Sequence, residues 1–255
     1  MVRPWRFRVS CGFAFMKRLF ACGMVVMLVA GAVAAPAPPD SRPLIWIVDG
    51  AGDLRGCSNA FTNANMLAGG PMDLTVFPWS HGYRRIFLDQ VDTKHSRMQG
   101  ARLAERILER KKAEPGRRVI VVAHSAGAGV ALAAGDVLPA GTVDRMILLA
   151  PSVSTGYDLR PSLAASREGI DVFCSKKDWV ALGFVTRVIG TVDKRWAPAA
   201  GRHGFRSWCE PSQLRQHFWT AEQAWTGHTG GHYGMHAPAF LHTYVFPLIA
   251  PEATR

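Results

Sequence analysis

Ser125 stands where the chain is expected to pass from a strand into a helix. It lies in the run Val119-Ile-Val-Val-Ala-His-Ser-Ala-Gly-Ala-Gly129, whose first part is β-branched and whose second part is small. A serine on so sharp a turn takes a strained backbone, so Ala123 and Gly127 must both be small. The hydroxyl then projects above the sheet edge, and the N–H of Ala126 points to where an oxyanion would form. This pattern is typical of a nucleophilic serine; the other interpretation is a serine that caps a helix.

The same segment resembles the nucleophile elbow of the α/β-hydrolase family, and its Ala-His-Ser-x-Gly form that of small secreted bacterial lipases and esterases. Ala123 stands where the family usually has Gly. The resemblance covers residues 44–249. It implies a minimal α/β-hydrolase fold, with a mostly parallel sheet of about six strands and helices on both faces. It also implies a serine, an acid and a histidine in that order along the chain.

The resemblance places the acid after the second strand beyond the elbow, where Asp178 follows the strand expected over 170–174. Asp178 also fits the N-cap of a helix expected over 179–189, and the two roles are compatible. Asp158, after the preceding strand, is the alternative. Asp171 lies within a strand.

The histidine is expected on a loop shortly before the C-terminal helix, in Gly227-His-Thr-Gly-Gly-His-Tyr-Gly-Met-His236. Gly-Gly-His-Tyr-Gly around His232 resembles the family's Gly-His-aromatic segment, so His232 is preferred, followed by His228 and then His236. On a helix these three would share one face and could bind Zn²⁺. Four glycines make a helix there unfavourable, so neither a metal nor another cofactor is expected.

The resemblance also implies a second oxyanion donor just after the first strand, where Ala51 is the positional match and Gly50 the next. The other interpretation is a plain turn. The implied reaction is hydrolysis of a small-molecule ester through an acyl-enzyme, with His232 as base and Asp178 as its partner. A peptidase, thioesterase, amidase or acyltransferase would use the same residues. A non-catalytic binding protein on this fold also stays open.

Apolar runs that alternate with helical patterns must position these residues. The alternation predicts βαβ units, and hence a parallel sheet within one domain over 35–255. A helix over 97–112 is expected to bury Met98, Ala101, Ala104, Ile107 and Leu108, and another over 238–246 to be stopped by Pro247. The strands are expected at 44–48, 74–77, 119–122, 145–150, 170–174 and 214–219.

Residues 1–34 have the pattern of a secretory signal peptide. Five basic residues and no acidic one accompany an apolar run from Leu19 that ends in Ala32-Val-Ala34. Cleavage is expected before Ala35, and Met16 is an alternative start. The protein is therefore expected to be exported, to the periplasm or beyond the cell. An uncleaved membrane anchor is the alternative, although the run is shorter than the roughly 20 residues that a spanning helix needs.

The formal charge of +11 and the pI near 10.0 suggest nucleic-acid binding at first sight. Without the leader's five basic residues the charge is +6, and much of that lies over 97–118 among apolar residues at helical spacing, as on a solvated helix. No basic stripe with stacking aromatics is present, so nucleic acid is not expected as a partner. The 48% of hydrophobic residues excludes a disordered chain.

Three smaller expectations concern the cysteines, a possible cap and the tryptophans. Cys57 and Cys209 could form a disulfide, whereas Cys174, at the end of a strand, is expected to be a buried thiol. Residues 191–213 could form a modest cap, and the absence of a large lid favours small or medium esters. Five tryptophans are expected either to border an aromatic pocket or to pack the core: Trp79, Trp179, Trp208, Trp219 and Trp225.

Overall fold

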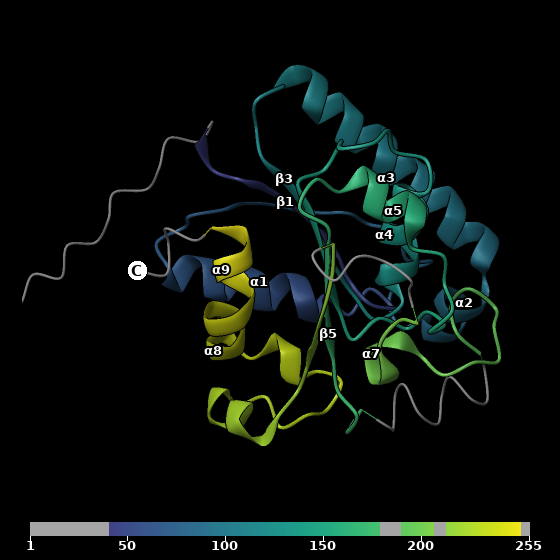
Figure 1. Ribbon diagram of the computed structural model, residues 1–255, viewed down its shortest axis with the longest axis vertical. Helices are drawn as coiled ribbons and strands as arrows, with labels where there is room; N and C mark the ends of the chain where they lie inside the picture. The colour runs from purple at the N-terminus through teal and green to yellow at the C-terminus, as the bar shows by residue number, and fades with distance from the viewer. Residues whose placement is uncertain (1–40, 179–189, 207–212, 251–255) are drawn as a thin grey trace, which may run out of the picture. The chain divides into compact units, whose positions relative to one another are not determined.

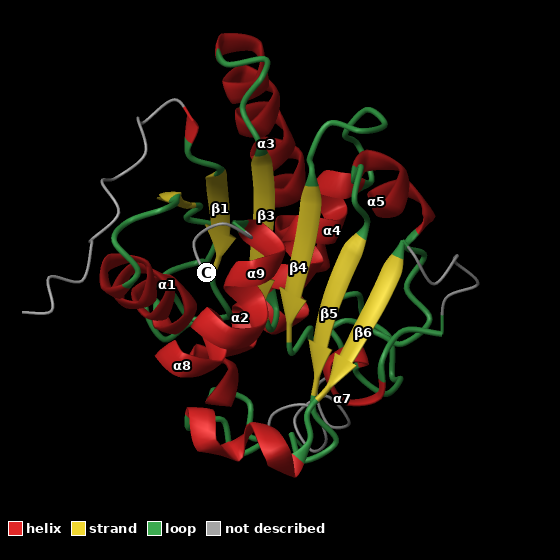
Figure 2. Ribbon diagram, turned by 60° about the vertical axis from the view of Figure 1, so that its left-hand side comes forward, coloured by secondary structure: helices red, strands yellow, loops and turns green. Residues whose placement is uncertain are grey.

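Six parallel strands form one sheet in the computed structural model, which describes residues 41–178, 190–206 and 213–250. Their order is β2-β1-β3-β4-β5-β6, and every neighbouring pair runs parallel. Figure 2 shows β1, β3, β4, β5 and β6 side by side in this order. The predicted fold class is confirmed, and each strand begins within one residue of its expected start. The strands are β1 (Leu44–Val48), β2 (Asp73–Val76), β3 (Val119–His124), β4 (Arg145–Leu149), β5 (Ile170–Cys174) and β6 (Leu214–Phe218).

Helices cover both faces of this sheet (Figure 1). One face packs against α3 (Thr93–Ala113), α4 (Gly127–Gly135) and α5 (Arg160–Ala165). The other packs against α1 (Gly56–Leu67) and a C-terminal segment of α8 (Pro238–Phe240), a π-helical turn (Leu241–Val245) and α9 (Phe246–Ile249). Because the inner strands are buried on both sides, β1 is apolar at every position and β3 at every position except its last, His124. In β5 the one polar residue is the buried Asp171. The shorter helices are α2 (Ile86–Val91), α7 (Ala200–His203), and the 3₁₀ turns Ala221–Thr226 and Gly234–His236.

The buried face of α3 includes Ala104 and Ile107, as predicted, but not Met98 and Leu108. Met98 and Leu108 are 45% and 39% exposed, whereas Gly100 and Leu103 are buried. A Cβ on Gly100 would lie 2.5 Å from the Cβ of Ala133, so α3 approaches α4 closely at this glycine. That close contact sets the rotation of α3 and turns Met98 outward.

The prediction that Pro247 stops the C-terminal helix is wrong. Pro247 lies in the first turn of α9. The preceding π-helical turn, over Leu241–Val245, bonds residues five apart and so changes the hydrogen-bond register. Pro247 then falls in the first turn of a new α-helical segment, where its missing N–H leaves no bond unmade.

The predicted Cys57–Cys209 bridge is wrong, because Cys57 is a free thiol buried in the first turn of α1. Burial, and next the charge of Asp49, raises the pKa of that thiol well above its usual value. Cys174 is buried and free, as predicted. Cys209, the leader 1–34 and the helix expected over 179–189 lie outside the described residues. Within the described ranges, no helix is both long and apolar enough to cross a bilayer.

Candidate active site

Ser125 occupies the turn between β3 and α4 with a φ of +53°, in the left-handed region. Its N–H donates to the carbonyl of Leu149 at 3.0 Å, and its own carbonyl accepts from the N–H groups of Ala128 and Ser152. These bonds hold a conformation that a non-glycine residue rarely adopts. A Cβ on Gly127 would lie 2.3 Å from the carbonyl oxygen of Asp49, so only glycine fits at that position.

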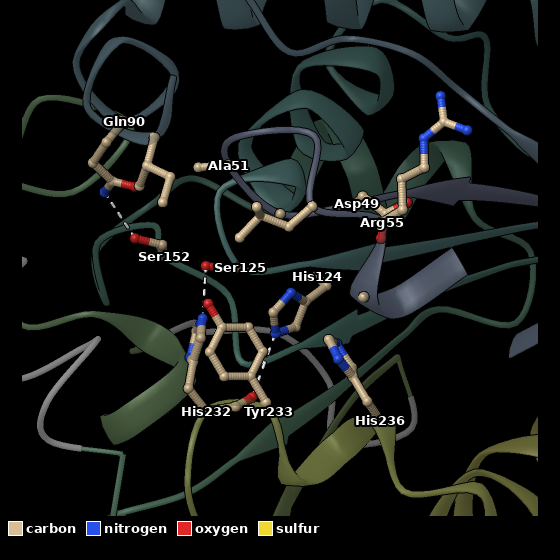
Figure 3. A pocket seen from close by; sticks show the side chains of 14 residues that line it. Asp49, Ala51, Arg55, Gln90, His124, Ser125, Ser152, His232, Tyr233 and His236 are labelled. Atoms are coloured by element: carbon tan, nitrogen blue, oxygen red, sulfur yellow. Dashed lines mark hydrogen bonds between the residues drawn. The ribbon is translucent and has the colours of Figure 1, made fainter. Parts of the chain in front are cut away.

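Ser125, His232 and Asp178 form one hydrogen-bonded chain. Ser125 Oγ lies 2.9 Å from His232 Nε2, and His232 Nδ1 lies 2.5 Å from Asp178 Oδ2 (Figure 3 shows the first of these bonds). The side chains of His232 and Asp178 are only 9% and 2% exposed. Ser125 and Asp178 follow the carboxyl ends of β3 and β5, and His232 lies on the loop before α8, so the chain assembles at that edge of the sheet.

Two loops that carry Asp178 and His232 are tied to each other by Ser175. Its hydroxyl donates to the carbonyl of Gly230 at 2.5 Å, and its carbonyl accepts from the N–H of Asp178 at 3.1 Å. Lys177 lies with its Nζ 4.4 Å from the ring centre of Trp219, whose Nε1 donates to the carbonyl of His228. The acid and the histidine are therefore positioned by one shared network.

The alternative acids lie in ion pairs of their own. Asp158 is exposed and pairs with Arg160. Asp171 is fully buried in β5, where it binds Arg145, Arg215 and His217. Neither carboxylate is bonded to a histidine of the 227–236 loop.

The alternative histidines pack around the chain instead of joining it. His228 is fully buried, its Nδ1 accepts the N–H of Gly230, and its ring lies against Phe240. His236 stacks edge-on against His124, with ring centres 4.4 Å apart. Among the described residues, no group of three His, Cys, Asp or Glu side chains is arranged to hold a metal ion.

Burial keeps the neighbouring histidines neutral near pH 7. Desolvation lowers the pKa of His228 and of His236 to about 4, and the pKa of His124 well below its usual value. The rings of His124 and His232 lie 4.7 Å apart. A positive charge that formed on His232 would therefore have one adjacent counter-charge, Asp178, and no charged histidine beside it.

Asp49, Gly50 and Ala51 line the pocket, and Figure 3 shows Ala51 on the side opposite His232. The N–H groups of Ala51 and Ala126, the two predicted oxyanion donors, have no acceptor within the described ranges. The next N–H along, that of Gly52, donates to Asp89 Oδ2 at 2.6 Å. At the other end of the loop, Asp49 Oδ1 accepts the first N–H groups of α1, from Cys57 and Ser58. The loop is thus fixed on both sides of Ala51.

Asp89, which sequence reasoning did not single out, holds this loop from α2. It is fully buried and also accepts from Ser80 Oγ and from the N–H and ring of His81. The available signal was an acid inside the apolar run Ile86-Phe-Leu-Asp-Gln-Val91. Gln90, its neighbour, donates to Ser152 Oγ at 2.8 Å and to the carbonyl of Gly190.

A cavity of about 200 Å³ opens at Ser125. None of the described tryptophans among those expected there lines it: Trp79 is buried in the core and Trp225 is 68% exposed. Trp179 and Trp208 lie outside the described residues. The described part of the expected cap packs into the body instead, with Val192 against Gly129. The cavity is lined by Asp49, Gly50, Ala51, Leu54, Arg55, Gly56, Ile86, Gln90, His124, Ser125, Ser152, His232, Tyr233 and His236.

Comparison with known proteins finds similarity in structure only. No family model matches the chain, and no curated protein does. A candidate hydrolase of the alpha/beta superfamily from Xanthomonas campestris is 16% identical, with a TM-score of 0.44, over 78% of this chain and 96% of its own. Lipase BlEst2 of Bacillus licheniformis is 15% identical (TM-score 0.44; 87% and 95%), and esterase Pf2001 of Pyrococcus furiosus 11% (0.42; 79% and 82%). At such distances, the chemistry of this chain has to be argued from its own residues.

Proposed function

We propose that this protein is a serine hydrolase of the α/β-hydrolase family that cleaves carboxylic esters through an acyl-enzyme. One observation carries the proposal: Ser125, in a left-handed turn, is hydrogen-bonded to His232, which is hydrogen-bonded to the buried Asp178. A nucleophile, a base and a group that orients the base are the parts that acyl transfer from an ester needs.

The proposed reaction begins when His232 Nε2 takes the proton of Ser125 and Oγ attacks the ester carbonyl. Asp178 accepts the Nδ1–H of His232, which fixes the tautomer and stabilises the imidazolium. The unpaired N–H groups of Ala51 and Ala126 are assigned to the oxyanion that forms. His232 then gives its proton to the leaving alcohol as the C–O bond breaks. Water, deprotonated by His232, releases the acid and restores Ser125.

The size of the cavity favours short acyl groups. Its volume of about 200 Å³ is below the roughly 300–1,000 Å³ of sites that enclose a drug-sized ligand. Leu54 and Ile86 supply the apolar part of its wall, and Gln90 with Ser152 a polar part. Acetate and butyrate esters are therefore expected to be cleaved with a higher kcat/KM than decanoate esters of the same alcohol.

The test compares two serines that line the cavity, Ser125 and Ser152. A fluorophosphonate probe is expected to label the wild type and Ser152→Ala, but not Ser125→Ala. Chromogenic esters of increasing acyl length are then assayed on the same three proteins. Labelling of folded Ser125→Ala, or ester hydrolysis by it at the wild-type rate, would exclude the assignment. A folded wild type that takes no label would favour a non-catalytic binding protein.

Export by the leader is part of the proposal. Its support is the basic, then apolar, then small-residue pattern that ends at Ala34. Expression of the whole chain in a bacterial host is expected to yield an exported protein whose N-terminal sequence begins at Ala35. A cytoplasmic product that retains residues 17–34 would contradict this.

A further inference from the structure

Helix α2 has its polar side inward and its apolar side outward. Ile86, Phe87 and Leu88 are 47%, 61% and 40% exposed, whereas Asp89 and Gln90 are 0% and 6% exposed. A surface helix normally shows the opposite arrangement, with its apolar residues on the core. The exposed run extends back through Tyr83, at 72%, so that six consecutive residues over 83–88 face solvent.

The inversion has a structural cause on its inner side. Asp89 binds Gly52, Ser80 and His81, and Gln90 binds Ser152. These bonds fix the rotation of α2, so Ile86, Phe87 and Leu88 have no route into the core. Three adjacent large apolar side chains left in water are unfavourable, and such patches mark surfaces that another apolar phase or molecule covers.

This surface is continuous with the mouth of the cavity. We define the α2 patch as the exposed apolar residues beside that mouth: Leu54, Tyr83, Ile86, Phe87 and Leu88. Leu54 and Ile86 belong to it and also line the cavity. Tyr233, 61% exposed, stands on the cavity wall next to His232 (Figure 3).

The charges within the patch indicate what kind of surface it binds. Arg84 and Arg85 are exposed and interrupt the apolar run. Neither has an acidic partner among the residues that the structure describes. Arginines beside exposed apolar and aromatic side chains match a surface with an apolar interior and an anionic, polar boundary. An anionic lipid surface has both properties.

We propose that the α2 patch docks this protein on an anionic lipid surface. Phe87 and Leu88 enter the boundary between headgroups and acyl chains, Tyr83 lies at headgroup level, and Arg84 and Arg85 bind lipid phosphates. The mouth of the cavity then faces the lipid. Docking itself does not depend on the proposed hydrolysis.

The experiment measures binding of Ser125→Ala, which cannot turn over the proposed substrate, to vesicles. Vesicles of phosphatidylcholine with phosphatidylglycerol are compared with vesicles of phosphatidylcholine alone. Phe87→Gln/Leu88→Gln is expected to lower the partition coefficient tenfold or more, because the loss of even one buried apolar side chain has an effect of about this size. Arg84→Gln/Arg85→Gln is expected to lower it about fivefold per arginine on the anionic vesicles only, less in high salt.

The matched control is Met66→Gln/Leu67→Gln, which removes two apolar side chains that are 71% and 81% exposed at the far end of α1. It is expected to bind like its parent. Equal binding by control and patch variants, equal binding to both vesicle types, or no binding at all would each overturn the proposal. So would self-association that Phe87→Gln/Leu88→Gln abolishes, since a second copy would then cover the patch. Ester hydrolysis by the same variants in the Ser125 background reports on the proposed function separately.

Discussion

Gly127→Ala tests whether the close approach of α4 to β1 positions the site. A Cβ at residue 127 would lie 2.3 Å from the carbonyl oxygen of Asp49 and 2.6 Å from that of Val48. Both contacts are with backbone, so no side chain can rotate away. Since ordinary contact begins at 3.4 Å, the loop after β1 and the first turn of α4 must separate by about 1 Å.

That displacement is expected to lower the stability of the protein slightly and its kcat strongly. An unhindered Gly→Ala change in a helix stabilises by up to about 1 kcal/mol. Overpacking costs about 1–3 kcal/mol, so a net loss is expected, which lowers the Tm by several degrees in a domain of this size. The larger effect is on kcat, because Ala51 and Ser125 sit on the two parts that move. A misplacement of about 1 Å between reacting groups lowers the rate about 10²-fold.

The assay compares kcat for a short-chain ester, well below the Tm of the variant, with the Tm from thermal unfolding. Gly116→Ala is the control, because a Cβ there meets no atom within 4 Å. We expect the control to keep both values and Gly127→Ala to lose about 10²-fold in kcat. A Gly127→Ala protein with wild-type kcat would refute the positioning argument, whatever its Tm.

Three further substitutions separate the groups around the site. Asp178→Asn is expected to lower kcat about 10⁴-fold with little change in KM, because an amide does not hold the required tautomer of His232; steady-state kinetics with wild-type kcat would contradict this. Asp89→Asn is expected to lower kcat about 10-fold or more, because it turns an amide N–H toward the donors that fix the Gly52 loop, whereas Ser80→Ala removes one bond and has a smaller effect. His228→Asn is expected to flatten the loss of stability in acid. Burial lowers the pKa of His228 to about 4 in the folded protein. Between pH 6.5 and 4 the unfolded chain therefore binds one more proton than the folded protein, and the free energy of unfolding decreases as the pH is lowered. For this group the decrease is at most about 3 kcal/mol. Urea unfolding across that range measures the slope, and an unchanged slope would exclude His228 as its source.

The strands were predictable because their environment is simple. A parallel strand covered on both faces is apolar at nearly every position, so β1 and β3 are visible as apolar runs without any knowledge of the partner strands. β5 departs from this only at Asp171, which is buried and paired with Arg145 and Arg215. The edge strand β6 is half-buried and less distinct, yet its bounds also agree. The rotation of α3 was not predictable, because it depends on Gly100 meeting Ala133 across 33 residues of sequence.

The site divides in the same way. The turn at Ser125 is a local feature, since the strained residue and the small residues around it lie within five positions. Asp178 and His232 are 54 residues apart, and nothing local distinguishes His232 from His228. What separates them in the structure is the hydrogen bond of Gly230 to His228, which commits that ring to holding the loop. The resemblance to a family supplied the order of the residues, and the three-dimensional network supplied the reason.

Helix α2 shows why periodicity alone misplaces functional residues. A rule that sends apolar residues inward would bury Ile86, Phe87 and Leu88 and expose Asp89, which is the reverse of the structure. Asp89 can stay buried because it accepts from three donors besides the N–H of Gly52. The residue before Gly52, Ala51, lines the cavity, and its N–H has no acceptor within the described ranges. The same rotation that fixes the proposed oxyanion loop therefore forces the apolar side of α2 into solvent. The burial of Asp89, which holds the Gly52 loop, and the exposure of Ile86, Phe87 and Leu88 thus follow from one rotation of α2. A change in that rotation would alter both the loop and the exposed surface.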